Sequence, residues 1–375
     1  MLKAMDSAVA GLRAHQNKLD VIGNNIANVN TNGYKAQNYT FKDSLYTTAA
    51  SSSGGQATNG SATVGGINAS QYGYGSMTGV ISTDMSSTTP NYVGGFNASI
   101  NGAGFFVTKS TNIRLNLQEV DKTKPDEAAT KAASNSALMK NSQFSFTRVG
   151  QFSIDANGYI VDANQNFVYG YQPASEKVSY KDKDGKTQEG MADITNPEAY
   201  DMTHLQPLRA PVSITFDADN VNSTALHIWS FGTYSAPNGG YASPDTSKNQ
   251  TAIQMKSVSV DDSGIIKGIV QNDQGNPVTI VLGKVAIASF QNPEGLTKAG
   301  NNTFVTSNVD NSGTVTTDAP GGATSTLMAG YLEGSNVDLA KEFSDMITTE
   351  RGFQANSKLI TVSDEVLQEL VNMKR

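Results

Sequence analysis

The sequence predicts a multidomain α + mainly β protein, with paired, coiled-coil-like N- and C-terminal helices, a discontinuous inner β domain and an inserted outer β domain. Apolar residues recur at three- and four-residue steps at both ends of the chain, which is the spacing of one helix face. Between the ends the apolar period falls to two, which is typical of strands. The 375 residues suggest two or three domains, and 38% hydrophobic residues suffice for their cores.

A first helix is predicted over residues 2–29. Its apolar residues share one face because they are spaced three or four apart. They are Leu2, Met5, Val9, Leu12, Leu19, Ile22 and Ile26. Asn30 to Gly33 end the helix, because Asn and Gly tolerate the left-handed conformation in which helices terminate.

A second helix is predicted over residues 336–373, which contain no proline. One apolar series repeats every seven residues, which favours a coiled-coil seam over an ordinary surface helix. This series is Leu339, Met346, Phe353, Ile360 and Leu367, and Phe343, Val366, Leu370 and Val371 widen it. Residues 1–46 carry five bases and three acids, whereas residues 333–375 carry five bases and eight acids. We expect the two terminal segments to pair, either as an intramolecular hairpin alone or also with other copies of the chain.

A linker and an inner β domain are predicted next. Residues 47–70 are rich in Ser, Gly, Ala and Thr and cannot bury enough apolar surface to fold alone, so we expect a linker or pliant arm. Residues 71–172 and 281–332 form the predicted inner domain. Within it, Asp155–Gly158 joins two alternating runs into a hairpin.

The more polar residues 173–280 form the predicted outer β domain. If this domain is inserted into the inner one, the strands near residues 155–170 and 281–290 should pair with each other or with common neighbours. A second polar stretch, residues 110–141, is either helical or disordered on composition.

Composition excludes several classes of function. A net charge of −7 argues against nucleic acid as the main partner, because phosphate binding needs a basic surface. The absence of cysteine excludes disulfides and thiolate metal sites. No apolar run approaches the roughly 18 residues that span a bilayer. We expect no cleaved signal peptide, because Asp6, Arg13, His15 and Lys18 interrupt any apolar core there.

The sequence predicts no catalytic, cofactor or metal site. Asp182 to Gly185 imitate the centre of an EF-hand, but Tyr180 and Met191 stand where ligands are required, so a solvated turn is the better interpretation. The other chemistry-bearing residues are scattered or lie beside turn formers, where Asp bonds its own backbone. They are Asp217, Asp219, Asp261, Asp262, His15, His204, His227 and Trp229.

Several motifs resemble those of the bacterial flagellar rod and hook proteins. At the N-terminus the similar segment is Leu19–Lys35 (LDVIGNNIANVNTNGYK), and at the C-terminus Gly334–Phe343 (GSNVDLAKEF) and Glu350–Lys358 (ERGFQANSK). The inner-domain signature of the family is matched by Ile100–Phe106 (INGAGFF) and Thr147–Phe152 (TRVGQF). Two long terminal motifs in the expected order make chance similarity improbable.

The resemblance implies a structural, non-enzymatic subunit that polymerises into a hollow, flexible helical tube, the flagellar hook, which passes motor torque to the filament. It implies that the terminal helices line the channel and that self-assembly rests on their apolar residues. These are Leu12, Leu19, Ile22, Ile26, Leu339, Phe343, Met346, Phe353, Ile360 and Leu367. The implied partners are further copies of the chain, the distal rod protein, the hook cap protein, the hook–filament junction protein and the flagellar type III export apparatus. The implied location is extracellular, in the basal body and hook, without nucleic acid or a membrane span.

The hook branch of the family is favoured over the rod branch by two features. About a hundred residues lie between Tyr171 and Val281, enough for an outer domain, and Phe41–Leu45 (FKDSL) is similar to the hook subunit. The alternatives are the distal rod protein and a non-flagellar surface adhesin of β structure. An adhesin would explain the strands but not the terminal heptads, and an enzyme is disfavoured because no acid, base or nucleophile set stands out.

Overall fold

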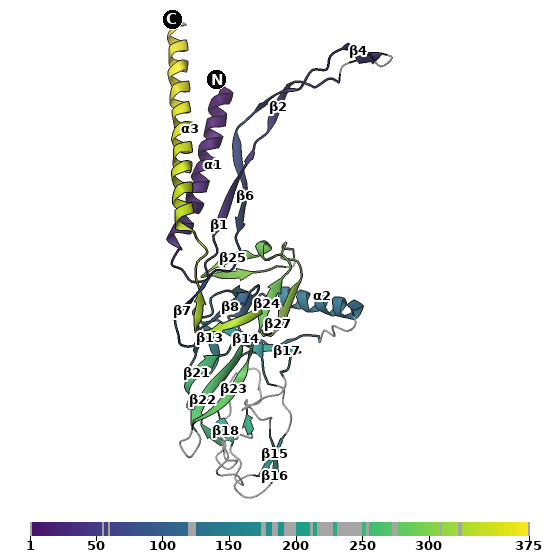
Figure 1. Ribbon diagram of the computed structural model, residues 1–375, viewed down its shortest axis with the longest axis vertical. Helices are drawn as coiled ribbons and strands as arrows, with labels where there is room; N and C mark the ends of the chain where they lie inside the picture. The colour runs from purple at the N-terminus through teal and green to yellow at the C-terminus, as the bar shows by residue number, and fades with distance from the viewer. Residues whose placement is uncertain are drawn as a thin grey trace. The chain divides into compact units, whose positions relative to one another are not determined.

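A computed structural model of the chain describes residues 2–54, 56–58, 61–118, 125–173, 178–181, 187–190, 200–210, 213–215, 228–230, 250–252, 255–271, 277–307, 309–321 and 325–373. The chain divides into two compact units, and each is described by itself. Unit 1 comprises Met1–Thr31, Lys35–Ser86 and Ser335–Arg375, and unit 2 comprises Asn32–Tyr34 and Ser87–Gly334. The predicted combination of terminal helices with a mainly β middle is confirmed (Figure 1).

Two long helices run side by side in unit 1, α1 (Leu2–Ala27) and α3 (Leu339–Met373) (Figure 1). Both lie within a turn of their predicted limits. Asp338 caps α3, because its Oδ1 accepts hydrogen bonds from the backbone nitrogens of Ala340 at 2.9 Å and Lys341 at 3.3 Å. The pairing of the terminal segments follows the prediction, since α1 and α3 pack along each other.

A long two-stranded ribbon fills the rest of unit 1. Its antiparallel pairs are β1 (Gln37–Asp43) with β6 (Ser76–Thr83), β2 (Tyr46–Ala50) with β5 (Ser70–Gly73), and β3 (Gln56–Thr58) with β4 (Ser61–Val64). Described parts of residues 47–70, the predicted linker or pliant arm, lie in strands of this ribbon, where backbone pairing holds them.

Unit 2 is built of strands with one longer helix. The strands of its first half are β7 (Pro90–Tyr92), β8 (Ala98–Gly102), β9 (Phe105–Lys109), β10 (Leu115–Asn116), β11 (Ser145–Thr147), β12 (Phe152–Ile154), β13 (Ile160–Asp162), β14 (Phe167–Tyr171), β15 (Val178–Lys181), β16 (Thr187–Gly190), β17 (His204–Pro207) and β18 (Ser213–Thr215). Those of its second half are β19 (Ile228–Ser230), β20 (Gln250–Ala252), β21 (Met255–Val260), β22 (Ile265–Gln271), β23 (Pro277–Val285), β24 (Ile287–Phe290), β25 (Thr297–Gly300), β26 (Thr303–Val305), β27 (Val315–Asp318), β28 (Ser325–Ala329) and β29 (Tyr331–Glu333). A 3-10 turn spans Pro293–Gly295.

One sheet of 14 described strands dominates unit 2, with β21-β22-β23-β14-β9-β11-β26-β25 as its main path. Smaller antiparallel pairs, β28 with β8 and β29 with β7, join the start of unit 2 to its end. The predicted hairpin is present, because β12 and β13 pair on either side of Asp155–Gly158. The predicted pairing of the flanking strands is also confirmed, since Gly170 of β14 faces Val285 of β23.

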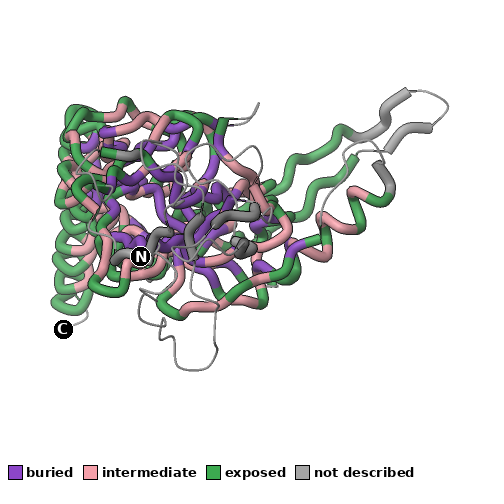
Figure 2. Tube along the Cα trace, turned by 90° about the horizontal axis from the view of Figure 1, so that it is seen from below, coloured by how far each residue is buried: buried purple, intermediate pink, exposed green. Residues whose placement is uncertain are grey.

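The core of unit 2 is apolar and rich in aromatic rings. Phe106, Ile160, Val168, Ile280 and Leu282 belong to one cluster and are 0% exposed. Edge-to-face ring pairs recur through the unit, including Phe106 on Phe152 at 5.2 Å between ring centroids. Figure 2 shows buried segments gathered in the strands, whereas α3, which leads to the C-terminus, is mainly exposed.

Residue 280, the predicted end of the outer β domain, lies within strand β23. Strands β21 and β22, which that boundary assigns to the outer domain, continue the sheet of β14, and Val260, Ile266 and Val270 join the same core cluster as Phe106. The amphipathic pattern of β22 comes from packing on this core. Most of residues 174–254 lie outside the described residues, so an inserted outer domain there stays a prediction.

The polar stretch at residues 110–141 is helical in its second half. Helix α2 (Pro125–Asn141) packs on β27, where the Ser136 hydroxyl accepts a hydrogen bond from the backbone nitrogen of Val315 at 2.9 Å. Met139, a residue of the same helix, is buried. Of the two conformations that composition left open, the helix is the one adopted over residues 125–141.

Candidate self-assembly surface

The seam between α1 and α3 is made by small residues that let the two backbones approach closely. A methyl group on Gly11 would lie 3.0 Å from Nδ2 of Asn356, and one on Gly352 would lie 2.6 Å from Cε1 of His15. Ala8 and Ala14 are buried on the same side of α1. The helix pair in unit 1 is therefore held by close backbone packing rather than by large interlocking apolar side chains.

Polar side chains occupy one heptad position of α3 in this seam. Glu342 and Thr349 are buried, and Asn356 and Ser363, which follow at seven-residue steps, are half-buried. Asn25 of α1 donates a hydrogen bond from Nδ2 to Oε1 of Glu342 at 3.0 Å. Burial raises the pKa of Glu342, and the hydrogen bond from Asn25 partly opposes that rise. The hydrogen bond between Asn25 and Glu342 requires a specific register of α1 on α3, which apolar contacts alone would not require.

Two cationic or titratable residues of α1 flank the same seam. The Nζ of Lys18 lies 3.7 Å from Oδ1 of Asp345 on α3. Burial, followed by the nearby charge of Lys18, lowers the pKa of His15. The Nδ1 atom of His15 is buried without a hydrogen-bond partner, so the neutral ring suits this position. These contacts favour α1 and α3 as a defined pair over a loose hairpin.

The base of the ribbon packs on α1. Phe41 lies with its ring centroid 5.1 Å from that of His15, and Asn17 donates to the hydroxyl of Thr78 at 3.1 Å. Farther along, the Nζ of Lys3 lies over the ring of Tyr72 at 5.6 Å. Much of the ribbon's apolar surface stays exposed, at Leu45, Tyr46, Ile67, Tyr72, Val80 and Ile81.

The residues predicted to serve self-assembly divide between the seam and the surface. Ile22 is buried inside unit 1, whereas Leu339, Phe343 and Phe353 are exposed. The other six residues are half-buried, namely Leu12, Leu19, Ile26, Met346, Ile360 and Leu367. The structure thus brings part of the predicted set into the α1–α3 pair and leaves three large side chains at the surface.

A second apolar stripe lies on α3, and the sequence analysis assigned two of its members, Val366 and Leu370, to the heptad series without recognising the stripe. Its members recur at three- and four-residue steps and so share one side of the helix. They are Leu359, Val362, Val366, Leu370 and Met373, and every one is exposed. We call this set the α3 stripe. The signal that could have found it is the three-and-four spacing at the end of the chain, which runs out of step with the heptad of Leu339 to Leu367.

The residues with possible chemistry are far apart or engaged in local turns. Among the described residues, no group of three or more His, Asp or Glu side chains could hold a metal ion. Asp261 accepts hydrogen bonds from the backbone nitrogens of Ser263 and Ile265, and His204 pairs with Asp201 three residues before it. The EF-hand-like turn at residues 182–185, the acids Asp217 and Asp219, and His227 lie outside the described residues. Within the described part of the chain, no helix combines the length and apolarity needed to span a membrane.

Comparison with known families matches both ends of the chain. Residues 5–35 match the family described as flagella basal body rod protein. Residues 328–373 match the family described as flagellar basal body rod FlgEFG protein C-terminal. The two matches contain α1 with the turn that follows it, and β29 with α3, so they coincide with the terminal motifs.

Whole-chain relatives bear flagellar names. The chain is 32% identical over 382 residues to the flagellar basal-body rod protein FlgG of Bacillus subtilis, with 100% of both chains covered. It is 28% identical over 486 residues to the flagellar hook protein FlgE of Borreliella burgdorferi, again with 100% of both chains covered. It is 27% identical over 420 residues to FlgE of Escherichia coli, covering 99% of this chain and 100% of the relative.

The terminal motifs, the helix pair that contains them and the full-length similarity point in one direction. The chain belongs to the family of bacterial flagellar rod and hook proteins.

Proposed function

We propose that this chain is the structural subunit of a bacterial flagellar hook, which polymerises into a hollow, flexible helical tube and passes motor torque to the filament. The role is mechanical and includes no catalytic step. Full-length similarity to hook proteins supports the assignment. The single structural observation that carries it is the exposed α3 stripe, whose five apolar side chains are left uncovered in unit 1.

The α3 stripe suits contacts between copies of the chain. Contiguous apolar patches are rare on monomers and mark interaction sites when they occur. The stripe and the exposed ribbon lie on different elements, so a contact between them in two copies would be heterologous rather than self-complementary. Heterologous contacts that do not close form helical polymers, which is the arrangement that a tubular structure requires.

We propose that the residues predicted to serve self-assembly contribute to these contacts between copies of the chain. Leu339, Phe343 and Phe353 are exposed and available to neighbouring copies, whereas Ile22 would act indirectly by holding α1 on α3. The half-buried members, such as Ile360 and Leu367, would contribute to both the pair and the polymer. We propose that the helices of assembled subunits line the channel of the tube.

A distal rod subunit is the second candidate. It is favoured by the similarity to the rod protein FlgG, since the alignment spans 382 residues and covers both chains completely. The hook is preferred because Phe41–Leu45 resembles the hook subunit and because residues 174–254, which precede β21, leave room for an outer domain. A surface adhesin would not need the matched terminal segments.

The proposed partners follow from the hook assignment. They are further copies of the chain, the distal rod protein, the hook cap protein, the hook–filament junction protein and the flagellar type III export apparatus. The proposed location is the hook outside the cell. Nucleic acid is not among the proposed partners, which agrees with the net charge of −7.

Complementation separates the two candidates. The chain is expressed in a strain that lacks its hook subunit and in one that lacks its distal rod subunit, and basal bodies are purified for electron microscopy. We expect curved hooks and restored swimming only in the first strain. Straight rod extensions and rescue only in the second strain would assign the chain to the rod, and rescue of neither strain with no polymer formed would overturn the axial assignment.

A further inference from the structure

The polypeptide passes between units 1 and 2 at several places, and the residues beside these passages are held by hydrogen bonds. The passages lie at the short segment Asn32–Tyr34, between Ser86 and Ser87, and between Gly334 and Ser335. In each unit, one residue of the C-terminal passage bonds to both of the other passages. That residue is Glu333 in unit 2 and Asn336 in unit 1.

Glu333 is the hub in unit 2. Its backbone oxygen accepts a hydrogen bond from the nitrogen of Gly33 at 2.9 Å, and its Oε1 accepts one from the nitrogen of Thr88 at 3.3 Å. The hydroxyl of Thr88 donates to the oxygen of the next residue, Gly334, at 2.9 Å. All three passages therefore meet at one short segment on the unit 2 side.

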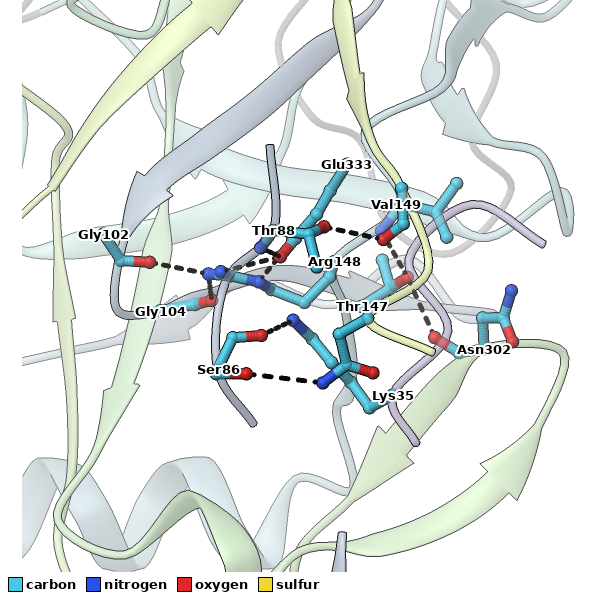
Figure 3. A network of polar contacts seen from close by, with 12 residues as sticks. Lys35, Ser86, Thr88, Gly102, Gly104, Thr147, Arg148, Val149, Asn302 and Glu333 are labelled. Atoms are coloured by element: carbon cyan, nitrogen blue, oxygen red, sulfur yellow. Dashed lines mark hydrogen bonds and ion pairs between the residues drawn. The ribbon is translucent and has the colours of Figure 1, made fainter. Parts of the chain in front are cut away.

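A buried arginine fixes the carboxylate of this hub. Nε of Arg148 lies 2.7 Å from Oε2 of Glu333 and its second terminal nitrogen lies 3.2 Å from Oε1, so the guanidinium binds the carboxylate through two bonds (Figure 3). The other side of the guanidinium donates to the backbone oxygens of Gly102 and Gly104. Both charged side chains are at most 3% exposed, so Glu333 has little freedom to move.

Close packing adds to the hydrogen bonds at the N-terminal passage. Gly33 has a φ of +69°, and a methyl group there would lie 2.7 Å from Cγ2 of Val149. Only glycine fits this turn without strain. Next to it, Lys298 places its Nζ 4.6 Å from the ring centroid of buried Tyr34, and Asn302 donates to the oxygen of Asn32. The passage is therefore seated in unit 2 by residues on both sides of Gly33.

Asn336 is the corresponding hub in unit 1. Its Oδ1 accepts a hydrogen bond from the nitrogen of Ala36 at 2.6 Å, and its Nδ2 donates to the oxygen of Asp84 at 2.9 Å. The nitrogen of Asp84 in turn donates to the oxygen of Ala36 at 2.8 Å. Buried Lys35 donates from Nζ to the oxygen of Ser86 at 2.6 Å. The same three passages are thus held together again on the unit 1 side.

We propose that residues 333–336 form a double clasp, in which Glu333 fastens the three passages to one another in unit 2 and Asn336 fastens them in unit 1. Only Gly334 and Ser335 separate the two hubs, so the unfastened spans are short. Short spans have few conformations and restrict how far the units can move or twist against each other. Three passages that are bonded to one another share a mechanical load, whereas three independent linkers would be loaded one after another.

The mechanical consequence rests on the proposed function. A subunit that transmits torque needs a connection that bends without letting one unit rotate freely about the other. The double clasp supplies such a connection from hydrogen bonds, the buried ion pair and the close packing at Gly33. It also makes both hubs depend on a segment far along the chain, because Ala36, Asp84 and Thr88 obtain these partners only when residues 333–336 are in place.

Amide hydrogen exchange on the purified full-length monomer tests the clasp. In Asn336→Ala, the amide of Ala36 loses its acceptor, and we expect it to exchange up to roughly tenfold faster, as loss of one hydrogen bond allows. Asn336→Asp keeps an oxygen for Ala36 but loses the donor to Asp84. We therefore expect the amide of Ala36 to stay protected in this variant while residues 84–86 exchange faster.

A second variant and a control complete the design. Thr88→Val keeps the side-chain shape and loses the bond to Gly334, so we expect limited proteolysis to increase at residues 334–335 with no change in the core of unit 2. Asn38→Ala, at an exposed asparagine of β1, should behave like the unaltered chain. Unchanged protection of Ala36 in Asn336→Ala would overturn the proposal, and so would an equal loss of protection throughout unit 1. Because the monomer is measured, either result leaves the hook assignment to be decided by complementation.

Discussion

Units 1 and 2 bury their apolar residues in different ways. Unit 2 encloses a core of interlocking aromatic and aliphatic side chains, with Phe106, Phe144 and Phe146 at 0% exposure. Unit 1 has a narrow seam of Gly, Ala and polar residues, and many of its large apolar side chains are exposed on α3 and on the ribbon. The protein therefore keeps its own stability in one unit and leaves adhesive surface in the other.

This difference indicates how a polymer subunit can fold on its own and still assemble. A core such as that of unit 2 contributes most of the free energy of folding without any partner. A seam of small residues such as Gly11 and Gly352 holds α1 and α3 together while using few large apolar side chains. Those side chains remain free for other copies. Substitutions in the two units should accordingly have separable effects.

The largest effect is expected from Phe106→Ala in unit 2. Truncating this fully buried ring leaves a cavity and removes its edge-to-face contact with Phe152, which should lower the free energy of unfolding by about 3–5 kcal/mol. Calorimetry of the monomer measures the loss. The same truncation at an exposed site, Phe343→Ala on α3, should leave the melting of unit 2 unchanged. Similar losses from both would erase the distinction between the units.

A comparably large effect is expected at the buried ion pair of unit 2. Arg148→Met leaves the carboxylate of Glu333 buried without its counter-ion, which should cost about 3–5 kcal/mol. Removing both charges, in Arg148→Met with Glu333→Leu, should recover much of that loss, because the uncompensated charge disappears. Chemical denaturation of the two variants gives the comparison. A double variant no more stable than Arg148→Met would show that the charges are not the cause.

A smaller effect, confined to unit 1, is expected from Gly352→Ala. The added methyl group would meet the ring of His15 at 2.6 Å and push α1 from α3, at a cost of about 1–3 kcal/mol. Gly23→Ala is the matched control, since a methyl group there meets nothing within 4 Å, and alanine should stabilise the helix by about 0.5–1 kcal/mol. Amide hydrogen exchange along α1 measures the effect of both substitutions. Equal behaviour of the two variants would contradict the close seam.

The sequence predicted where the helices and strands of each unit lie better than it predicted which of their sides pack against other elements. The heptad from Leu339 to Leu367 located α3, and Asp155–Gly158 located a hairpin, because both signals are local. The side of α3 that meets α1 was not predicted. It is selected by Gly11 and Gly352, which carry no side chain and so leave no trace in a hydrophobic pattern. The polar series of Glu342 and Thr349 was hidden because polar residues do not contribute to an apolar pattern.

The ribbon and the full extent of the main sheet were missed for a different reason. Strands β2 and β5 form through backbone pairing between segments such as Thr47 and Tyr72, and exposed strands show no alternation of apolar residues. The register of β22 on β23 likewise depends on contacts with β14 and the core, which no local pattern reveals. Motifs conveyed the family, whereas long-range pairing decided the architecture.

A weak pH dependence is expected in the seam of unit 1. Burial raises the pKa of Glu342 above its usual value of 4.5, so the folded pair binds a proton that the unfolded chain has released. Stability of the pair should therefore fall as the pH rises through 4.5 toward the raised value. Glu342→Gln keeps an oxygen for Asn25 and should remove this dependence. The exchange rates of the α1 amides between pH 4 and 7 test this prediction. A pH dependence of stability that persists in Glu342→Gln would show that another group titrates.

The most direct test of the division between the units is Val366→Asp on the exposed α3 stripe. In the monomer the new carboxylate stays in water, so the free energy of unfolding should change by no more than about 0.5 kcal/mol. In a polymer it would be buried at every contact, and assembly should be lost. Thr361→Asp is the control, because this exposed residue lies five positions earlier and about 140° around the helix from Val366. Calorimetry and sedimentation of both variants should show unchanged melting in each and loss of polymer only in Val366→Asp. Normal polymerisation of Val366→Asp, or a sharp fall in its melting temperature, would contradict the account.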